Sequence, residues 1–122
     1  MSQATSTSGT STTTPVTAPD APTAKPAYIF FIKEATLDAD EMAQYGAAVG
    51  ATFEGHDAQV LAAYDAHEVV EGAPMEGVVL LKFPSVAAAR AWYFSPAYQA
   101  AAQHRFRGAT YRAVITEGRV IG

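Results

Sequence analysis

The sequence predicts an α+β domain in which helices cover one face of an antiparallel sheet. Two observations carry this prediction. Short runs rich in β-branched and aromatic residues have the composition of strands, at residues 27–33, 58–64, 78–83 and 110–117. Two longer segments with helical character, residues 38–55 and 85–108, lie between them. The resulting order of strand, helix, strand, strand, helix and strand is the split βαβ, or ferredoxin-like, arrangement.

The first and third of these strands predict how the sheet is covered. Residues 27–33 and 78–83 are apolar at nearly every position, so neither strand offers a polar face to water. We therefore expect both strands to be central. Helices can cover one face of the sheet, but the chain is too short to build a second sheet over the other. A second copy of the chain is the expected cover, and the sequence predicts a homodimer.

The second strand, residues 58–64, is expected to place Val60 and Ala62 on one face and Gln59 and Leu61 on the other. After a turn, residues 67–72 are expected to form either a short strand or an extended arm.

The first helical segment has a cap and an apolar stripe. Asp38 is suited to cap a helix N-terminus, where a carboxylate also meets the positive end of the helix dipole. Gly55 is the expected end of the segment. Large apolar side chains recur at spacings of three and four, at Met42, Tyr45, Val49 and Phe53.

The second helical segment is expected to be broken in two. Pro84 cannot donate to a sheet ladder, and Ser85 after it is a suitable N-cap. The signal recurs at Ser95, where Pro96 takes the first helical position. Both serines are therefore explained as caps rather than as nucleophiles, since no nucleophile-elbow motif surrounds them.

Composition bounds the function. Of residues 1–25, twelve are Ser or Thr, so we expect a disordered tail followed by one folded domain at 26–122. The chain has no cysteine and a net charge of −4, which argues against thiol chemistry and against nucleic-acid binding. No apolar run reaches the ~18 residues of a membrane span, and no secretion signal is evident. We expect a cytoplasmic protein that binds neither nucleic acid nor membrane.

Charge is unevenly distributed along the chain. Residues 34–76 contain ten acids and no Lys or Arg, whereas residues 77–122 contain six bases and one acid. One interpretation is a pair of complementary surfaces, within a subunit or across a dimer. The other is an anion-binding site near the basic half. The three histidines are widely separated and no nucleotide-binding motif is present, so we expect neither a metal nor an organic cofactor.

Several short segments together resemble a bacterial family of unknown function in the dimeric α/β-barrel superfamily. The resemblance covers residues 26 to about 120. Its segments are Ala27-Tyr28, Tyr45, Val70-Glu71-Gly72, Phe83-Pro84-Ser85, Ala88-Ala89-Arg90-Ala91-Trp92-Tyr93, Ser95-Pro96-Ala97-Tyr98-Gln99, Arg105 with Arg107, and Glu117-Gly118. It implies a ferredoxin-like subunit whose sheet pairs face to face with that of a second subunit. Relatives include cofactor-free monooxygenases, haem-handling enzymes and lactone isomerases, so the fold does not fix the function.

The resemblance also implies where a ligand lies, between the helices and the helix-facing side of the sheet. Candidate ligand-binding residues there are Tyr28, Tyr45, Trp92, Tyr98, Arg105 and Arg112, with His104 beside them.

Several of these residues have a structural alternative. Trp92 is either core filling or a pocket wall. The basic residues late in the second helical segment are His104, Arg105 and Arg107. They either complement the negative end of the helix dipole or form a site in which Arg105 binds an anion. Tyr98 and Arg105, seven residues apart, share a helix face. Arg105 is alternatively a brace for the fold, paired with Glu71 or Glu117.

Three functions remain open at this stage. The first is an uncharacterised homodimer with a small helix–sheet cleft that binds a small organic ligand. The second is a cofactor-independent enzyme, of oxygenase or isomerase type, acting on a small aromatic or carboxylate substrate. There His104 would be the catalytic acid and base, and Arg105 would hold the anion. The third is a purely structural dimer module whose N-terminal tail recruits another molecule.

Overall fold

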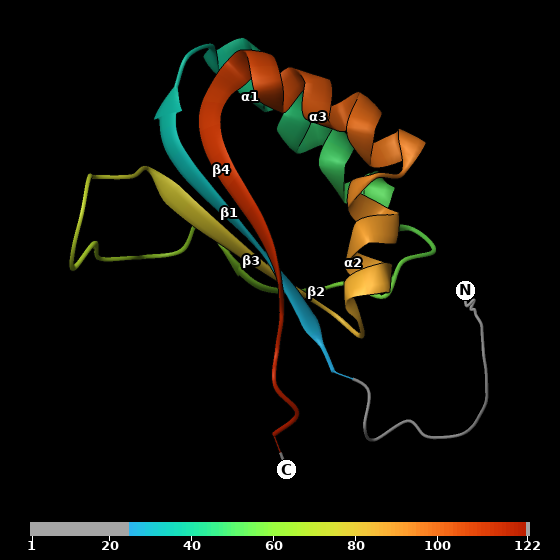
Figure 1. The fold of residues 1–122 in the computed structure, drawn as a ribbon. Helices are drawn as coiled ribbons and strands as arrows, with labels where there is room; N and C mark the ends of the chain where they lie inside the picture. Colours follow the sequence, from blue (N-terminus) through green and yellow to red (C-terminus); the bar gives the residue numbers. More distant parts are fainter. Residues whose placement is uncertain (1–24, 122) are drawn as a thin grey trace.

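The computed structural model describes residues 25–121, so all but the last residue of the predicted tail, residues 1–25, lies outside the described part. The element order confirms the predicted ferredoxin-like α+β fold (Figure 1). The strands are β1 (Ala27–Thr36), β2 (Gln59–Ala63), β3 (Gly77–Phe83) and β4 (Ala109–Glu117). The helices are α1 (Ala39–Val49), the short 3-10 helix η3 (Gly50–Phe53), α2 (Val86–Tyr93) and α3 (Pro96–Gly108).

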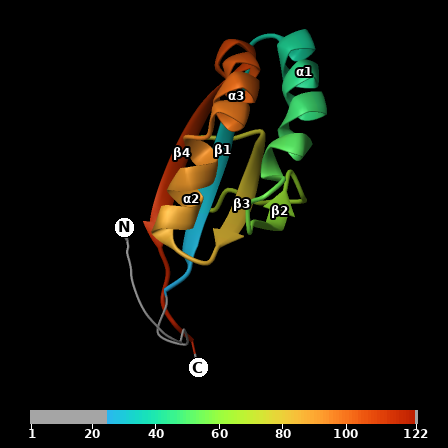
Figure 2. The ribbon, with the colours of Figure 1, turned by 90° about the vertical axis from the view of Figure 1, so that its right-hand side faces the viewer.

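The four strands form one antiparallel sheet in the order β2-β3-β1-β4. The two strands that are apolar on both faces, β1 and β3, are the central ones, as predicted. Helices α1, α2 and α3 lie on one side of the sheet, and the loop between β2 and β3 lies on the other (Figures 1 and 2). This layering creates a helix–sheet interior and a second sheet face without helices.

The predicted caps begin all three α-helices. The Asp38 carboxylate accepts hydrogen bonds from two backbone N–H groups of α1, and Ser85 and Ser95 each accept one at the starts of α2 and α3. The helical segment ends at Gly55 as predicted, although it is not an α-helix throughout. Helix α1 ends at Val49, η3 continues directly from it to Phe53, and Gly55 has a φ of 81°, the left-handed conformation common just after a helix end. The Thr52 hydroxyl donates to the Val49 carbonyl at 2.6 Å, which satisfies a carbonyl at the helix end.

The core lies between the helices and the sheet. Alternate residues of the central strands, among them Ile29 and Phe31 of β1 and Leu81 of β3, point toward the helices and are buried. Trp92 of α2 and Tyr98 of α3 fill the space above them. Because the pairing of β1 is regular from Ala27 to Lys33, the intervening residues there point to the face without helices.

Strand β2 does not alternate as predicted. Its register shifts between Val60 and Ala62, so Val60 pairs with Leu81 while Ala62 pairs with Leu80. Neighbouring residues of β3 face opposite sides, and Val60 and Ala62 therefore face opposite sides too. The expectation that they share a face was wrong, because a β-bulge at Leu61 inserts one residue.

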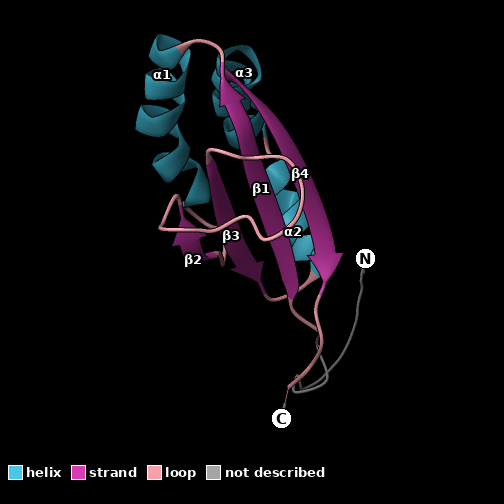
Figure 3. Ribbon diagram, turned by 90° about the vertical axis from the view of Figure 1, so that its left-hand side faces the viewer, coloured by secondary structure: helices cyan, strands magenta, loops and turns pink. Residues whose placement is uncertain are grey.

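The sheet face without helices is apolar at its centre. Phe30 pairs with Leu80 on one side and with Val114 on the other, which sets three apolar side chains in a row across three strands. Phe30 and Val114 are exposed. Residues 67–72 form no strand but belong to the extended loop that projects from this side (Figure 3), which confirms the arm alternative.

Candidate functional site in the helix–sheet layer

A cleft of about 190 Å³ opens between the edge strand β2 and the helices. Its walls come from β1, β2, β3, α1, η3 and α2, and most of the side chains are apolar. They are Phe31, Tyr45, Val49, Phe53, Val60, Ala63, Tyr64, Val79, Leu81 and Trp92. Only the two tyrosines and the indole N–H bring polar atoms to this set. Such a cleft suits an apolar molecule with few polar atoms.

Behind one wall of the cleft lies a chain of buried polar groups. The Tyr45 hydroxyl is hydrogen-bonded to the Tyr98 hydroxyl at 2.9 Å. The Arg105 Nε–H donates to the same Tyr98 hydroxyl at 3.2 Å. Tyr45 comes from α1, and Tyr98 and Arg105 lie seven residues apart on α3. The shared helix face predicted for Tyr98 and Arg105 is therefore present, and the chain connects a guanidinium to the cleft.

Arg105 is surrounded by aromatic rings. The residue is only 4% exposed, and its guanidinium carbon lies 5.1 Å from the ring centre of Phe31 and 4.9 Å from those of Phe106 and Tyr111. These distances are in the range of cation–π attraction, which offsets part of the lost hydration.

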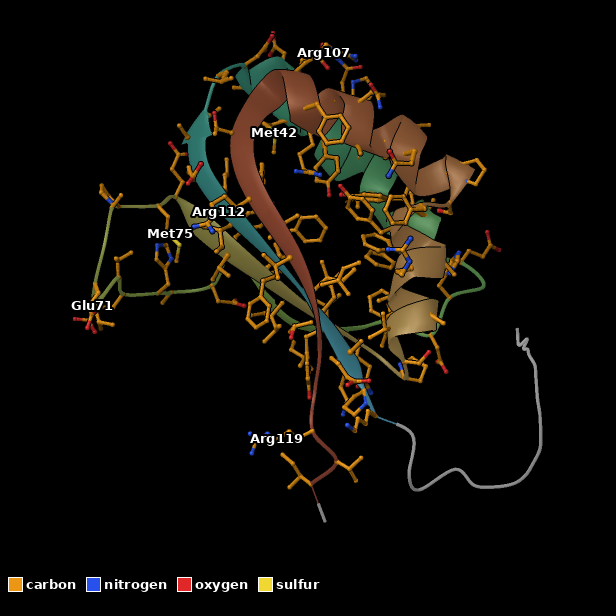
Figure 4. All side chains as sticks on the ribbon, viewed as in Figure 1. Met42, Glu71, Met75, Arg107, Arg112 and Arg119 are labelled. Carbon is orange, nitrogen blue, oxygen red and sulfur yellow. The ribbon has the colours of Figure 1, made fainter. Side chains whose placement is uncertain are left out.

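The proposed brace between Arg105 and an acid is not formed. Glu117 pairs instead with Lys25 at 3.7 Å, and Glu71 lies at the outer end of the β2–β3 loop (Figure 4). No ion pair between Arg105 and an acid forms within residues 25–121.

The phenols near Arg105 are held neutral. Burial, followed by the neighbouring Tyr98, raises the pKa of Tyr45 far above its ordinary value. Burial also raises the pKa of Tyr98, although Arg105 opposes the shift, and it raises the pKa of Tyr111. Burial alone would lower the pKa of Arg105, but its tyrosine neighbours raise it. The site therefore holds a permanent positive charge among neutral hydroxyl groups.

Tyr64 and Tyr111 belong to this site, and the sequence did not predict them. Their hydroxyl groups are hydrogen-bonded to each other. Tyr64 directly follows β2 and has a φ of 58°, in the left-handed region that few residues other than glycine adopt. Its ring lies on Gly77, whose lack of a side chain permits the approach. Tyr64 thus connects the edge strand β2 to β4, and it is 48% exposed at the mouth of the cleft.

Trp92 serves both of the roles considered for it. It is 1% exposed and stacks on Phe53 with ring centres 4.8 Å apart, so it is part of the core. It also lines the cleft. Its indole N–H donates to the Thr52 hydroxyl at 3.1 Å, which fixes the ring and satisfies the buried donor.

His104 does not converge on the guanidinium of Arg105. Its Nδ1 lies 2.7 Å from the carboxylate of Glu41 on α1, and Arg107 binds the same carboxylate at 3.1 Å. Hydrogen bonds from His104 and then Arg107 lower the pKa of Glu41. The cluster joins α1 to α3. Glu41 belongs to the acidic stretch of the sequence and Arg107 to the basic stretch, so this ion pair is one contact between the two predicted complementary surfaces.

Two further predicted residues lie elsewhere. Tyr28 lines a separate hollow with Lys82 and Arg119. Arg112 pairs with Ile32 on the sheet face without helices, the side on which the β2–β3 loop lies (Figure 4). Of the predicted ligand-binding residues, the structure brings together Tyr45, Trp92, Tyr98 and Arg105.

Other kinds of site were sought in the same residues. Within residues 25–121 no three His, Asp or Glu side chains are grouped so as to hold a metal ion. None of the helices described combines the length and hydrophobicity required to cross a lipid bilayer.

Comparison with known proteins places the chain. The model of a domain of unknown function, DUF1330, matches residues 26–119. The chain belongs to this family. No curated protein matches the sequence.

Solved structures similar to this DUF1330 domain show the same fold. A protein of unknown function from Rhodopseudomonas palustris is 20% identical, with a TM-score of 0.64 over 79% of this chain and 84% of its own. A dimeric ferredoxin-like protein of unknown function from Thermobifida fusca is 13% identical, with a TM-score of 0.54 over 76% and 91%. SnoaB, a cofactor-independent oxygenase from Streptomyces nogalater, is 13% identical, with a TM-score of 0.51 over 78% and 93%.

Proposed function

We propose that this DUF1330 protein is a homodimer that binds a small apolar organic molecule in the helix–sheet cleft of each subunit. The observation that carries the proposal is the cleft itself, about 190 Å³ in volume and walled by aromatic and aliphatic side chains. An apolar cavity of about 150 Å³ already accommodates benzene. The cleft therefore suits a molecule with one ring, or a short chain, and one polar end directed at Tyr45 or Tyr64.

Ligand binding is testable by thermal unfolding with a panel of small aromatic acids, amides and alcohols. At a ligand concentration ten times Kd, stabilisation of about 1.4 kcal/mol is expected, which raises Tm by at least about 5 °C in a domain of this size. Ala63→Phe fills the cleft and is expected to abolish the shift. Ala91→Phe is the matched control, because Ala91 is exposed on α2 and does not line the cleft.

Loss of the shift in both variants, or no shift with any compound in the wild-type protein, would argue against cleft binding.

The homodimer is supported by the apolar sheet face. Within residues 25–121 no helix lies on the sheet face that carries the row formed by Leu80, Phe30 and Val114 (Figure 3). Covering such a row with a second copy removes apolar surface from water, at roughly 25 cal/mol per Å². Sedimentation velocity at micromolar concentration is expected to show a dimer. Phe30→Glu is expected to give a folded monomer, and Leu37→Glu, at an apolar residue that is 67% exposed and outside this row, is expected to remain dimeric.

A monomeric wild-type protein would contradict this assembly.

A second candidate function is a cofactor-independent reaction on the same bound molecule. It is favoured by Arg105, a fixed cation behind the cleft that can stabilise an anion formed from the ligand. His104, assigned as acid and base in that hypothesis, is paired with Glu41 instead. Incubation of each bound compound with the protein in air, followed by mass spectrometry, distinguishes the two functions. An unchanged compound supports binding, and a product of altered mass that requires Arg105 supports catalysis.

A further inference from the structure

Arg105 is a buried cation without a counter-ion among the described residues. Its Nε–H donates to Tyr98, but its two Nη groups have no hydrogen-bond acceptor within residues 25–121. Two acids at the ends of neighbouring elements are bound to other groups. Glu76 is held by Thr36 at 2.6 Å and by Lys33 at 3.5 Å, and Glu41 is held by the outer bases of α3.

A buried guanidinium with free donors is strongly unfavourable unless an anion reaches it. The surrounding phenols do not supply that charge, because burial keeps Tyr45, Tyr98 and Tyr111 neutral. Aromatic rings from β1, α3 and β4 pack around the guanidinium within about 5 Å of its carbon. These rings attract the charge but do not provide the oxygen acceptors that the Nη N–H groups lack. Two parallel N–H donors of a guanidinium match the two oxygens of a carboxylate.

We propose that the ligand of this cleft is a small apolar monocarboxylate, whose carboxylate is bound by the Nη edge of Arg105. This inference rests on the proposed function and specifies its ligand. The apolar part of the ligand occupies the cleft, and its carboxylate reaches the buried polar groups behind the cleft wall, Tyr98 and Arg105. Phe31 and Tyr45 join the two compartments, because both line the cleft while Phe31 contacts Arg105 and Tyr45 is linked to it through Tyr98.

Tyr64 controls access between the two compartments. It lines the cleft, and its hydroxyl group holds that of Tyr111, whose ring lies on the guanidinium. Tyr64 is half-exposed and the β2–β3 loop follows it directly, so its ring lies at the surface and outside the buried core. Displacement of the Tyr64–Tyr111 pair by the carboxylate replaces one neutral hydrogen bond with charge-assisted ones.

The experiment uses the single tryptophan of the chain as its probe, because Trp92 lines the cleft. Emission is followed while the full-length protein is titrated with benzoate, phenylacetate and 3-phenylpropionate, and with the neutral amide of each. At least one acid is expected to bind tenfold or more tightly than its amide. Arg105→Met is expected to weaken the acid by tenfold or more, as charged hydrogen bonds generally do when lost, and to leave the amide unchanged. Arg107→Met, on the exposed side of α3, is the matched control and is expected to leave both unchanged.

Equal affinity for acid and amide in the wild-type protein would overturn the carboxylate assignment, while the proposed binding of a small molecule in the cleft would stand. Binding of neither, with no change in Trp92 emission, would overturn both. Arg105→Lys covers the case in which Arg105→Met fails to fold. It keeps the charge but lacks the planar fork, so a selective loss of acid affinity is expected there too, and retained wild-type selectivity would refute bidentate binding.

Discussion

Removal of one buried hydroxyl group, in Tyr98→Phe, tests the polar chain that links Arg105 to the cleft. Tyr98 is fully buried, and its hydroxyl bonds the Arg105 Nε–H at 3.2 Å and the Tyr45 hydroxyl at 2.9 Å. Loss of a hydrogen bond to a charged group costs about 1.5–3 kcal/mol, and a stranded buried hydroxyl adds about 1 kcal/mol or more. We therefore expect Tyr98→Phe to lower the free energy of unfolding by about 3 kcal/mol.

A double-mutant cycle separates this chain from simple packing. Tyr45→Phe alone is expected to cost only about 1 kcal/mol, because Tyr98 keeps its bond to Arg105. In the double variant no Tyr45 hydroxyl is left stranded. The total is therefore expected to stay near that of Tyr98→Phe, with a coupling energy of about 1 kcal/mol.

Urea unfolding at pH 7, followed by circular dichroism, measures these differences. Tyr93→Phe is the control, because within residues 25–121 the Tyr93 hydroxyl makes no side-chain hydrogen bond while its ring packs on Tyr98 at 5.3 Å. A cost below about 0.5 kcal/mol for Tyr98→Phe would refute the reasoning, because the two bonds would then contribute nothing net. Strict additivity with Tyr45→Phe would refute the coupling, because the Tyr45–Tyr98 bond would then add nothing to stability.

Two further predictions concern the edges of the site. Hydrogen bonds from His104 and Arg107 hold the pKa of Glu41 below 4.5, so the ionised carboxylate stabilises the fold above that pH and loses this effect as pH falls through its folded-state pKa. The Tm difference between wild type and Glu41→Gln should therefore shrink between pH 6 and pH 3, and a constant difference would contradict the linkage. Gly77→Ala places a methyl group 2.6 Å from the Tyr64 ring, which must move. Acrylamide quenching of the single tryptophan should increase, and unchanged quenching would mean that the ring does not cover the cleft.

The fold could be predicted because its signals are local. Two-sided apolar strands identify the centre of the sheet, and the caps at Asp38, Ser85 and Ser95 identify the helix starts. These features depend on a residue and its immediate neighbours, which a sequence displays directly.

The site was only half predictable, because part of it depends on backbone irregularity. The bulge at Leu61 and the positive φ of Tyr64 turn that ring toward the helices, and no local residue type announces either feature. Tyr111 carried a usable signal, since it alternates with Ile115 on β4 and both side chains are half-buried. Its contact with Arg105 depends on the packing of α3, which the sequence does not display.

The separation of His104 from Arg105 follows from helix geometry. Successive residues of a helix point about 100° apart, so two neighbours do not face one site. Tyr98, Ala101, Ala102 and Arg105 form the buried stripe of α3, and His104 falls beside it, toward α1. The seven-residue spacing of Tyr98 and Arg105 therefore predicted a shared site correctly, whereas the adjacency of His104 and Arg105 did not.

Strand β1 couples the two proposals, because Phe30 faces the row at the sheet centre and Phe31 faces the cleft. All groups assigned to ligand binding come from one subunit, so the cleft does not need a partner to be complete. We therefore expect the monomeric Phe30→Glu variant to bind its ligand within about twofold of wild type, by titration of Trp92 emission. Affinity lost together with the dimer, in a variant that still unfolds cooperatively, would show that the second copy shapes the cleft by pressing on β1 from behind.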